Sequence, residues 1–494
     1  MKGSVQMAFA IITLFSVMGA TSGPSGTTDG FSGLAVTTLD DYSPLVDIAV
    51  TIEILAIRAL DTIDTASGAD FFVTLTINGV AYRSPVWNDS DVLYPYWNLT
   101  VDVPDDIKTV TITMALTDWN TDGPVLCDIG SGKNSDSSGY TVTVVYDIAT
   151  GRWSGDDFIG DASGYGRASG CDDGSIYENE KDCEMWFTIY QNDYDHDGLP
   201  YWMETNEYGT DPTVDNRGED PDGDNIPIEW EHRWGFDPFH ADAHTVLDPD
   251  NDSITNMEEF LTSSAWSDPF RRDIFLEVDF MDRSSVGKAS CMPDNAVELL
   301  KNPFHRRNIV FHVETGGFVP MDGFTDPGEV LDIYRHHFIQ GDRDAWRRSV
   351  FHYGIFVHNC FPTGYSFAGD GPTFWGYLPG TNAFVVSASM MERYHLLSPG
   401  TSLDFFYASV IMHEMGHNFG IKLGTPMGCD NQFTKYPWQL GWYLYRNYKS
   451  IMNYRYTYEI LDYSDGSHGK RDFDDWSYIN LSYFELPPCE AMAW

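Results

Sequence analysis

From about Thr27 to Tyr190, hydrophobic and polar residues alternate in short runs that are typical of β-strands. The runs are rich in β-branched and aromatic residues, and clusters of Gly, Asn, Asp and Ser separate them. We expect strands at VDIAVTIEILAI (46–57), ADFFVTLTINGV (69–80), WNLTVDV (97–103), KTVTITMALTDW (108–119), YTVTVVYDI (140–148) and EMWFTIYQ (184–191). Six or more strands over this length predict an N-terminal β-sandwich.

The pattern changes after Arg271, where strand-like runs alternate with runs that have the hydrophobic spacing of helices. We expect strands at 272–281, 308–315, 353–359 and 382–390, and helices at 294–304 and 402–419. Ser402 should cap the last of these helices. From Gly420 onward the chain is aromatic and rich in loops. The segments before Gly420 therefore supply the helices and strands of the C-terminal region.

Between these regions, three segments align without a gap: DYDHDGLPYWME (193–204), DPDGDNIPIEWE (220–231) and DPDNDSITNMEE (248–259). Their spacing is that of calcium-binding loops, in which short carboxylates converge from alternate residues and a longer one returns at position twelve. Position six must bend sharply, which suits Gly198, is tolerated by Asn225 and suits Ser253 less. The predicted calcium ligands are Asp193, Asp195, Asp197, Glu204, Asp220, Asp222, Asp224, Glu231, Asp248, Asp250, Asp252 and Glu259.

An Asp-Pro segment follows each loop, as GTDP (209–212), GFDP (235–238) and WSDP (266–269). With this tandem spacing, the segment resembles thrombospondin type 3 and dockerin-like calcium repeats. The resemblance implies that calcium replaces a core these residues cannot build and stiffens the connection between domains. A solvated acidic linker is the alternative reading.

The order of strands before the repeats resembles the calcium- and lipid-binding sandwich domains of the synaptotagmin type. Its loops carry Asp118, Asp122 and Asp128, which are either calcium ligands or solvated loop carboxylates.

Charge narrows the possible partners, because 74 acidic residues stand against 29 basic ones, a formal charge of −45. Such a chain is repelled by nucleic acid and by anionic membranes. Residues 1–23 have the pattern of a secretory signal peptide, with an uncleaved N-terminal anchor as the alternative, and no later segment is apolar for long enough to span a bilayer. We therefore expect a secreted or cell-surface protein in which disulfides are permitted among the seven cysteines. The expected domains are 24–191 (β-sandwich), 192–270 (calcium repeats) and 271–494 (catalytic).

A zinc-binding motif lies on the helix expected at 402–419. In MHEMGHNFGIKLG (412–424), His413 and His417 are four residues apart, so both imidazoles project from one face. Glu414 is placed to move a proton between water and a leaving amine. Gly420 suits a left-handed helix end. A surface helix with two incidental histidines is the alternative.

A second motif follows downstream, where Ser450, Met452 and Tyr454 form S-x-M-x-Y. Together with H-E-x-x-H-x-x-G, this resembles the metzincin clan of zinc endopeptidases, which implies an α+β catalytic domain. The resemblance places Met452 in a turn beneath the zinc and gives Tyr454 a role at the metal or in transition-state stabilisation. It also makes 382–390 the edge strand that binds extended substrate.

The third zinc ligand departs from the metzincin pattern, because Leu423 stands where the clan has a histidine. Leishmanolysin carries an insertion at this point, and 421–432 resembles a shorter one. Asp430 is our first candidate for the third ligand; Cys429, His468, another residue or a lost site remain open.

These features predict a zinc endopeptidase that needs Zn²⁺ and Ca²⁺ and acts on protein or peptide substrates. The alternatives are a calcium-dependent adhesion or surface protein that retains the scaffold without catalysis, and a zinc hydrolase with a non-peptide substrate.

Overall fold

The computed structural model describes residues 42–65, 67–132, 139–157, 166–281, 291–319, 332–339, 346–360, 364–366, 382–398, 400–422, 424 and 426–481. The predicted signal peptide, Leu423 and Cys489 lie outside these residues.

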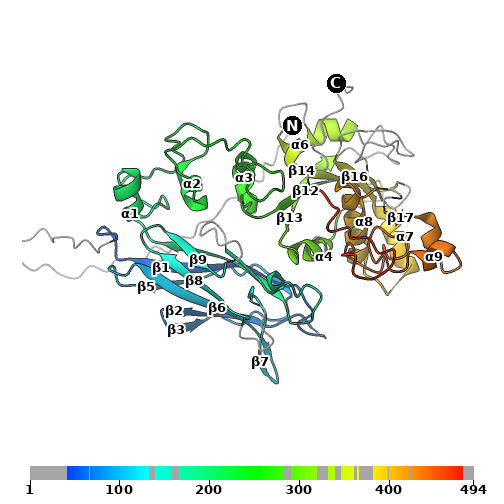
Figure 1. The fold of residues 1–494 in the computed structure, drawn as a ribbon, viewed down its shortest axis with the longest axis horizontal. Helices are drawn as coiled ribbons and strands as arrows, with labels where there is room; N and C mark the ends of the chain where they lie inside the picture. Colours follow the sequence, from blue (N-terminus) through cyan, green and yellow to red (C-terminus); the bar gives the residue numbers. More distant parts are fainter. Residues whose placement is uncertain are drawn as a thin grey trace, which may run out of the picture.

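Among the described residues, eleven strands form before the acidic loops (Figure 1). They are β1 (Ala49–Ala59), β2 (Phe71–Ile77), β3 (Val80–Arg83), β4 (Val92–Leu93), β5 (Trp97–Asp102), β6 (Thr109–Asn120), β7 (Gly123–Leu126), β8 (Val142–Asp147), β9 (Arg152–Gly155), β10 (Gly166–Ser169) and β11 (Cys183–Gln191). A short 3₁₀ turn, η1 (Gly170–Asp173), joins the last two strands.

These strands pair antiparallel in two sheets, one in the order β10-β11-β1-β4 with β5 also on β1, the other β3-β2-β6-β8-β9 with β7 on β6. In β6 every second residue is buried from Val110 to Asp118, as expected for a strand with one face on a core. The buried faces of both sheets share one hydrophobic cluster, which includes Ile52 of β1 and Leu75 of β2. Burial of these alternating side chains holds the two sheets together.

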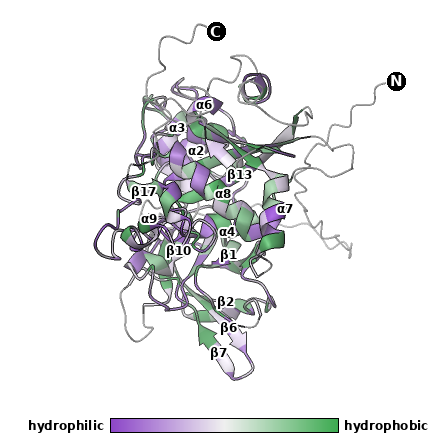
Figure 2. Ribbon diagram, turned by 90° about the vertical axis from the view of Figure 1, so that its right-hand side faces the viewer, coloured by the Kyte–Doolittle hydropathy of each residue, from purple (hydrophilic) through white to green (hydrophobic). Residues whose placement is uncertain are grey.

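The acidic loops follow as a chain of short turns with little regular structure, along the edge of the strands in Figure 1. Their helices are α1 (Tyr201–Met203), a π-turn η2 (Glu204–Tyr208), α2 (Ile228–Trp234), α3 (Asn256–Thr262) and a 3₁₀ turn η3 (Ser263–Ala265). Figure 2 shows α2 as largely hydrophilic. A small cluster of Ile226, Trp230 and Trp234 is the main apolar core here, so polar and charged groups carry much of the order.

The remaining elements follow from residue 273 onward. They are β12 (Asp273–Met281), α4 (Asp294–His305), β13 (Val310–Val319), the π-turn η4 (Tyr334–Phe338), α6 (Arg347–Val350), β14 (Phe351–Val357), β15 (Gly364–Ser366), β16 (Ala383–Ser387), α7 (Ala388–Leu397), α8 (Leu403–Asn418), β17 (Met427–Asp430), the 3₁₀ turn η5 (Gln432–Thr434) and α9 (Leu440–Leu444).

Five of these strands form one sheet in the order β13-β12-β14-β16-β15. The first four pair in parallel, and β15 runs antiparallel to β16. The segment 382–390 is therefore not an edge strand, as its sequence led us to expect: β16 lies between β14 and β15. Among the described residues, β15 forms this edge, and α8 packs against β15 and β16.

The predicted fold class is wrong. It combined an N-terminal β-sandwich, a calcium-loop linker and a metzincin-like α+β catalytic domain, whereas the described residues form mostly β-sheets with few helices. Parallel pairing explains part of the error. Such strands require crossover connections, as α4 provides between β12 and β13, so helices and strands interleave instead of segregating. In the described part of the chain, no helix has the length and apolar character needed to cross a membrane.

Buried charges join α4 to the N-terminal strands. Arg58 of β1 binds Glu184 of β11 and Glu298 of α4, and His305 Nδ1 lies 2.6 Å from Glu184 Oε1. Arg167 also binds Glu184, with 2.6 Å between Nη2 and Oε2. Burial alone would raise the pKa of Glu184, but His305 and the arginines hold it well below its usual range. This carboxylate therefore has its countercharges within the protein.

Candidate metal centres

Helix α8 carries the two histidines, and both of its ends are capped. The Ser402 side chain accepts a hydrogen bond from the Phe405 amide at 3.2 Å, which confirms the predicted N-cap. At the other end, the Ile421 amide donates to Gly416 O and the Gly420 amide to His417 O. This pair of hydrogen bonds forms a Schellman motif. Gly420 has a φ of +94°, in the left-handed region that the motif requires.

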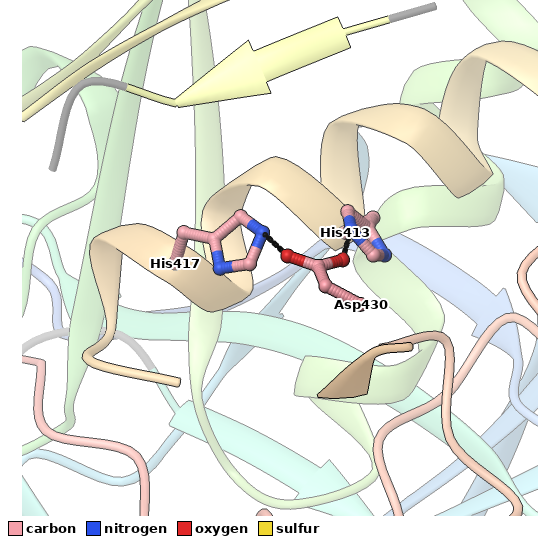
Figure 3. Close-up of side chains that lie close together, drawn as sticks. All are labelled: His413, His417 and Asp430. Carbon is pink, nitrogen blue, oxygen red and sulfur yellow. Dashed lines mark hydrogen bonds and ion pairs between the residues drawn. The ribbon is translucent and has the colours of Figure 1, made fainter. Parts of the chain in front are cut away.

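The structure brings His413, His417 and Asp430 together (Figure 3). His413 Nε2 lies 2.9 Å from Asp430 Oδ1, and His417 Nε2 lies 3.1 Å from Asp430 Oδ2. Asp430 comes from the end of β17, not from the helix, and its φ of +51° is one that aspartate tolerates better than most residues. The carboxylate therefore faces both imidazoles at once.

The other nitrogen of each imidazole faces a backbone carbonyl. His413 Nδ1 lies 2.9 Å from Ile451 O, and His417 Nδ1 lies 2.6 Å from Ile421 O. Since a carbonyl oxygen only accepts, each Nδ1 carries the hydrogen, and a neutral ring presents the lone pair of Nε2 to Asp430. A lone pair facing a carboxylate is unfavourable unless a proton or a metal cation lies between them. The donor set fits a metal with nitrogen and oxygen preference, such as zinc.

Charges at the site act in the same sense. Burial alone would lower the pKa of His417, but the charge and hydrogen bond of Asp430 raise it to about 9. Burial alone would raise the pKa of Asp430, but the two histidines hold it well below its usual range. The carboxylate thus favours a positive charge between itself and the rings.

The segment around Met452 helps to hold Asp430 and His413 in place. The Asp430 amide donates to Met452 O at 3.1 Å, so the same turn that orients His413 also holds the third residue. Met452 is fully buried, and a Cβ atom added to Gly416 of α8 would overlap its side chain. The glycine therefore permits close approach of the turn to the helix.

Glu414 lies between the histidines in sequence and is buried against β15. A Cβ atom added to Gly364 of β15 would lie 2.8 Å from Glu414 Oε1, so strand and carboxylate are in contact. Burial raises the pKa of Glu414 to about 6, against the opposing charges of the histidines. Its position suits a group that exchanges protons beside an edge strand.

Tyr454 stacks on the first histidine, with 5.7 Å between the ring centroids of Tyr454 and His413 and 16° between their planes. Burial, followed by the charges of Asp430 and Glu414, raises the pKa of its hydroxyl well above the usual range. The ammonium group of Lys435 lies 4.4 Å from the centroid of the same ring. The tyrosine is therefore a neutral hydrogen-bonding group at the site.

The other candidates for the third ligand lie elsewhere or are poorly suited. His468 lies 2.9 Å from Asp472 and 3.6 Å from Asp465, in a separate group. Cys429 is buried, and burial raises the pKa of its thiol well above its usual range, which disfavours the thiolate that zinc binds.

The acidic loops adopt the sharp bend expected at position six. Gly198, Asn225 and Ser253 have φ angles of +89°, +77° and +77°. Backbone amides at positions four to seven donate to the aspartates at positions one, three and five; for example, the Ser253 amide donates to Asp248 Oδ2 at 3.0 Å. The backbone therefore winds around each group of carboxylates.

Many carboxylate oxygens in the loops point inward without a hydrogen-bond partner. These buried atoms are Asp193 Oδ1, both oxygens of Asp195, Asp222 Oδ2, both oxygens of Glu231, Asp250 Oδ2 and Glu259 Oε1. Buried polar atoms without partners are costly, so their concentration here fits a set of oxygen ligands for a hard cation such as calcium.

Three residues that the loop motif does not contain recur at equivalent places. The amides of Asn216, Asp242 and Asp273 each donate to Oδ2 of the aspartate at position five of the preceding loop. Asn216, Asp242 and Asp273 follow that aspartate by 19, 18 and 21 residues. The loop motif does not include these positions, so the sequence analysis missed them.

The second loop contains a further residue missed from sequence, His244. Its Nε2 lies 3.3 Å from Asp224 Oδ2 and 3.5 Å from Glu231 Oε1. In the other two loops a hydroxyl group lies at this place: Thr210 donates to Glu204 in the first loop, and Ser267 donates to Glu259 in the third. His244 has the corresponding position beside Glu231 in the second loop.

The N-terminal loop aspartates have different surroundings. Asp118 is buried and accepts hydrogen bonds from the Asp70 amide and Asn120, and Asp122 is exposed. Asp128 lies with Glu180 and Asp182, and burial raises its pKa to about 7. The structure therefore does not gather these three aspartates into one site.

Comparison with family models and with curated proteins finds no match. Among solved structures, the chain is similar to human GIVD cytosolic phospholipase A2 in complex with methyl gamma-linolenyl fluorophosphonate, at 14% identity and a TM-score of 0.18 over 29% of this chain and 17% of that one. A structure described as a C2 domain matches at 10% identity and a TM-score of 0.19, over 29% of this chain and 98% of that one. A C2 domain of plant Extended Synaptotagmin 1 matches at 13% identity and a TM-score of 0.19, over 29% and 95%.

These structures are described as C2 domains or as a phospholipase A2. This chain spans less than a fifth of the phospholipase.

Proposed function

We propose that the chain is an exported, calcium-stabilised zinc endopeptidase. One observation carries the proposal: Asp430 faces Nε2 of both His413 and His417 while backbone carbonyls hold the opposite nitrogens. Two incidental histidines on a surface helix would not explain this orientation. The likeness to metzincins that we retain concerns the site residues, not the fold.

The three side chains would hold zinc through two nitrogens and one carboxylate. Zinc held there would supply Lewis-acid chemistry towards a carbonyl group and a water molecule. Glu414 takes a proton from water on its carboxylate and gives it to the nitrogen of the leaving amine. Tyr454 donates a hydrogen bond from its neutral hydroxyl to the oxygen on which negative charge develops.

Two features favour a polypeptide substrate. Within the described ranges β15 pairs only with β16, so an extended peptide could add to its other side, next to Glu414. The segment after Asp430 also exposes large apolar side chains, among them Phe433, Trp438 and Leu440. Apolar side chains of a substrate would be buried against such a surface.

Calcium has a structural role in this proposal. The three acidic loops would each bind one ion through the oxygens that lack partners, and these ions would order a segment with a small apolar core. The acidic charge of the chain suits an extracellular medium in which calcium is abundant.

The test uses the full chain and its Glu414→Gln variant, with cleavage of an unfolded protein and zinc content as readouts. We expect one zinc per chain in both proteins, and a loss of cleavage of about 10²- to 10⁴-fold in the variant, the range for a general base. A His468→Ala variant should cleave normally. A chain that binds zinc but cleaves nothing would contradict the catalytic role and support a non-catalytic surface protein; a chain that binds no zinc would contradict the metal site.

A further inference from the structure

The first strand of the C-terminal sheet follows the third acidic loop after α3, η3 and a short turn. That strand, β12, begins with Asp273, whose amide donates to Oδ2 of Asp252 at 2.6 Å. The Asp273 side chain is buried, with 2% of the residue exposed, although it is charged in water. A buried carboxylate at this position needs a compensating group.

Further carboxylates lie around Asp273. Asp252 and Glu259 are 3% and 1% exposed, and their negative charges act on that of Asp273. Ser267 donates to Glu259 Oε2, but the other oxygen, Oε1, is buried without a hydrogen-bond partner. Asp250 Oδ2 is also buried without a hydrogen-bond partner. Unpartnered oxygens within a group of buried carboxylates point to a missing cation.

Basic side chains from neighbouring elements also lie near this group, and the charges of Arg271 and Arg167 favour the charged form of the Asp273 carboxylate. His312 of β13 contacts Asp273, with 2.7 Å between Nε2 and Oδ1. Arg271 pairs with Asp157 at 2.9 Å and with Asp268 at 3.4 Å.

We propose that the Asp273 carboxylate is an additional ligand of the calcium ion in the third loop, so that this ion joins the repeats to β12. The inference rests on the calcium binding included in the proposed function. All candidate ligands are oxygens, and several are carboxylates, which is the set that calcium prefers over softer metals. Each oxygen of Asp273 that accepts a hydrogen bond keeps a second lone pair for the ion.

The third loop differs in this respect from the other two. At the equivalent positions the first loop has Asn216, which carries no charge, and the second has Asp242, which is partly exposed and lies 3.4 Å from His240. Only Asp273 is both charged and buried. Calcium in the third loop would therefore fix a residue of the sheet itself.

The consequence reaches the candidate zinc centre through the sheet. Strand β12 lies between β13 and β14 and is parallel to both. Helix α8 packs on β15 and β16 of the same sheet. An ion at the start of β12 would thus order the sheet on which the zinc-binding helix lies.

The test compares the full chain with Asp273→Asn, which keeps the backbone amide and the side-chain size. After removal of bound metal, calcium is titrated calorimetrically into each protein. We expect three sites in the unchanged chain, and one of them weakened about tenfold or more in the variant, because affinity follows the charge of the ligands. The matched control is Asp242→Asn, which should bind as the unchanged chain does.

A second measurement needs no substitution. Amide hydrogen exchange of residues 266–281 is compared in the unchanged chain with and without calcium, and we expect calcium to slow it. Equal calcium affinities in Asp273→Asn and the unchanged chain, or exchange that calcium does not alter, would overturn the role of Asp273. An unchanged chain that binds no calcium would instead overturn the calcium part of the proposed function.

Discussion

The candidate zinc centre and the third acidic loop both hold buried carboxylates, but their partners differ. Asp430 has two imidazoles within 3.1 Å, each oriented by a backbone carbonyl. Asp250, Asp252 and Glu259 have mainly one another, backbone amides and a serine. One site is organised before any ion binds, and the other concentrates negative charge that an ion must neutralise.

Because the two sites are built differently, loss of the metal should have different consequences at each. At the zinc centre, helix caps, the Met452 turn and packing fix the ligands, so losing zinc should remove chemistry but leave the fold. In the acidic loops the small apolar core cannot replace the ions, so losing calcium should remove stability. The predictions below separate these two kinds of dependence.

The largest effect should follow from Asp430→Ala. This change leaves two histidines, which hold zinc weakly, so we expect zinc affinity to fall about 100-fold or more and cleavage to fall with it. Zinc content by mass spectrometry, with calcium binding measured in parallel, checks the result. Calcium binding should change far less than zinc binding, because the calcium ligands lie in the acidic loops; an equal fall in both would contradict separate roles for the two regions.

Removal of calcium should come next in size. A ligand that binds only the folded state at 100 times its Kd contributes about 2.7 kcal/mol per site, so calcium chelation should lower the melting temperature by many degrees. A zinc-selective chelator at matched concentration should abolish cleavage with a much smaller change in melting temperature. Equal thermal effects of the two chelators would remove the distinction between the regions.

Gly420→Ala should have an intermediate effect. The φ of +94° at this residue costs a side-chain-bearing residue about 1–2 kcal/mol, and strain there shifts the Ile421 carbonyl that orients His417. We expect a lower free energy of unfolding together with weaker zinc binding. Gly424→Ala, which also has a positive φ but lies beyond this carbonyl, is the matched control: it should lose stability without losing zinc affinity.

Ser253→Gly should have the smallest effect, and it should be stabilising. Ser253 adopts a φ of +77° at position six of the third loop, where the first loop has glycine. Removing the Cβ strain should add up to about 1 kcal/mol, partly offset by the greater freedom of glycine in the unfolded chain. Denaturant unfolding in calcium checks this, and a clear loss of stability would show that the serine side chain has a role of its own.

Sequence reasoning went furthest where spacing alone sets geometry. His413 and His417 share a helix face by their four-residue spacing, and the bends at Gly198, Asn225 and Ser253 follow from loop chemistry. These features are local, so no knowledge of distant contacts was needed.

The failures concern pairing between distant segments. The segment 382–390 was expected at an edge, but the short β15 pairs with β16 and takes that place. The same limitation made the predicted fold class wrong, because strand patterns do not reveal parallel pairing. Asp273 lay within the strand predicted at 272–281 and was not singled out, since its proximity to Asp252 depends on the path of the chain across 21 residues.

The central claim is that His413, His417 and Asp430 bind one zinc ion. The most direct measurement is the zinc X-ray absorption spectrum of the purified full chain, compared with Asp430→Ala. We predict imidazole nitrogens and a carboxylate oxygen at about 2.0–2.2 Å in the unchanged chain, and loss of bound zinc in the variant. A sulfur ligand at about 2.3 Å, or the same spectrum in the variant, would contradict the account.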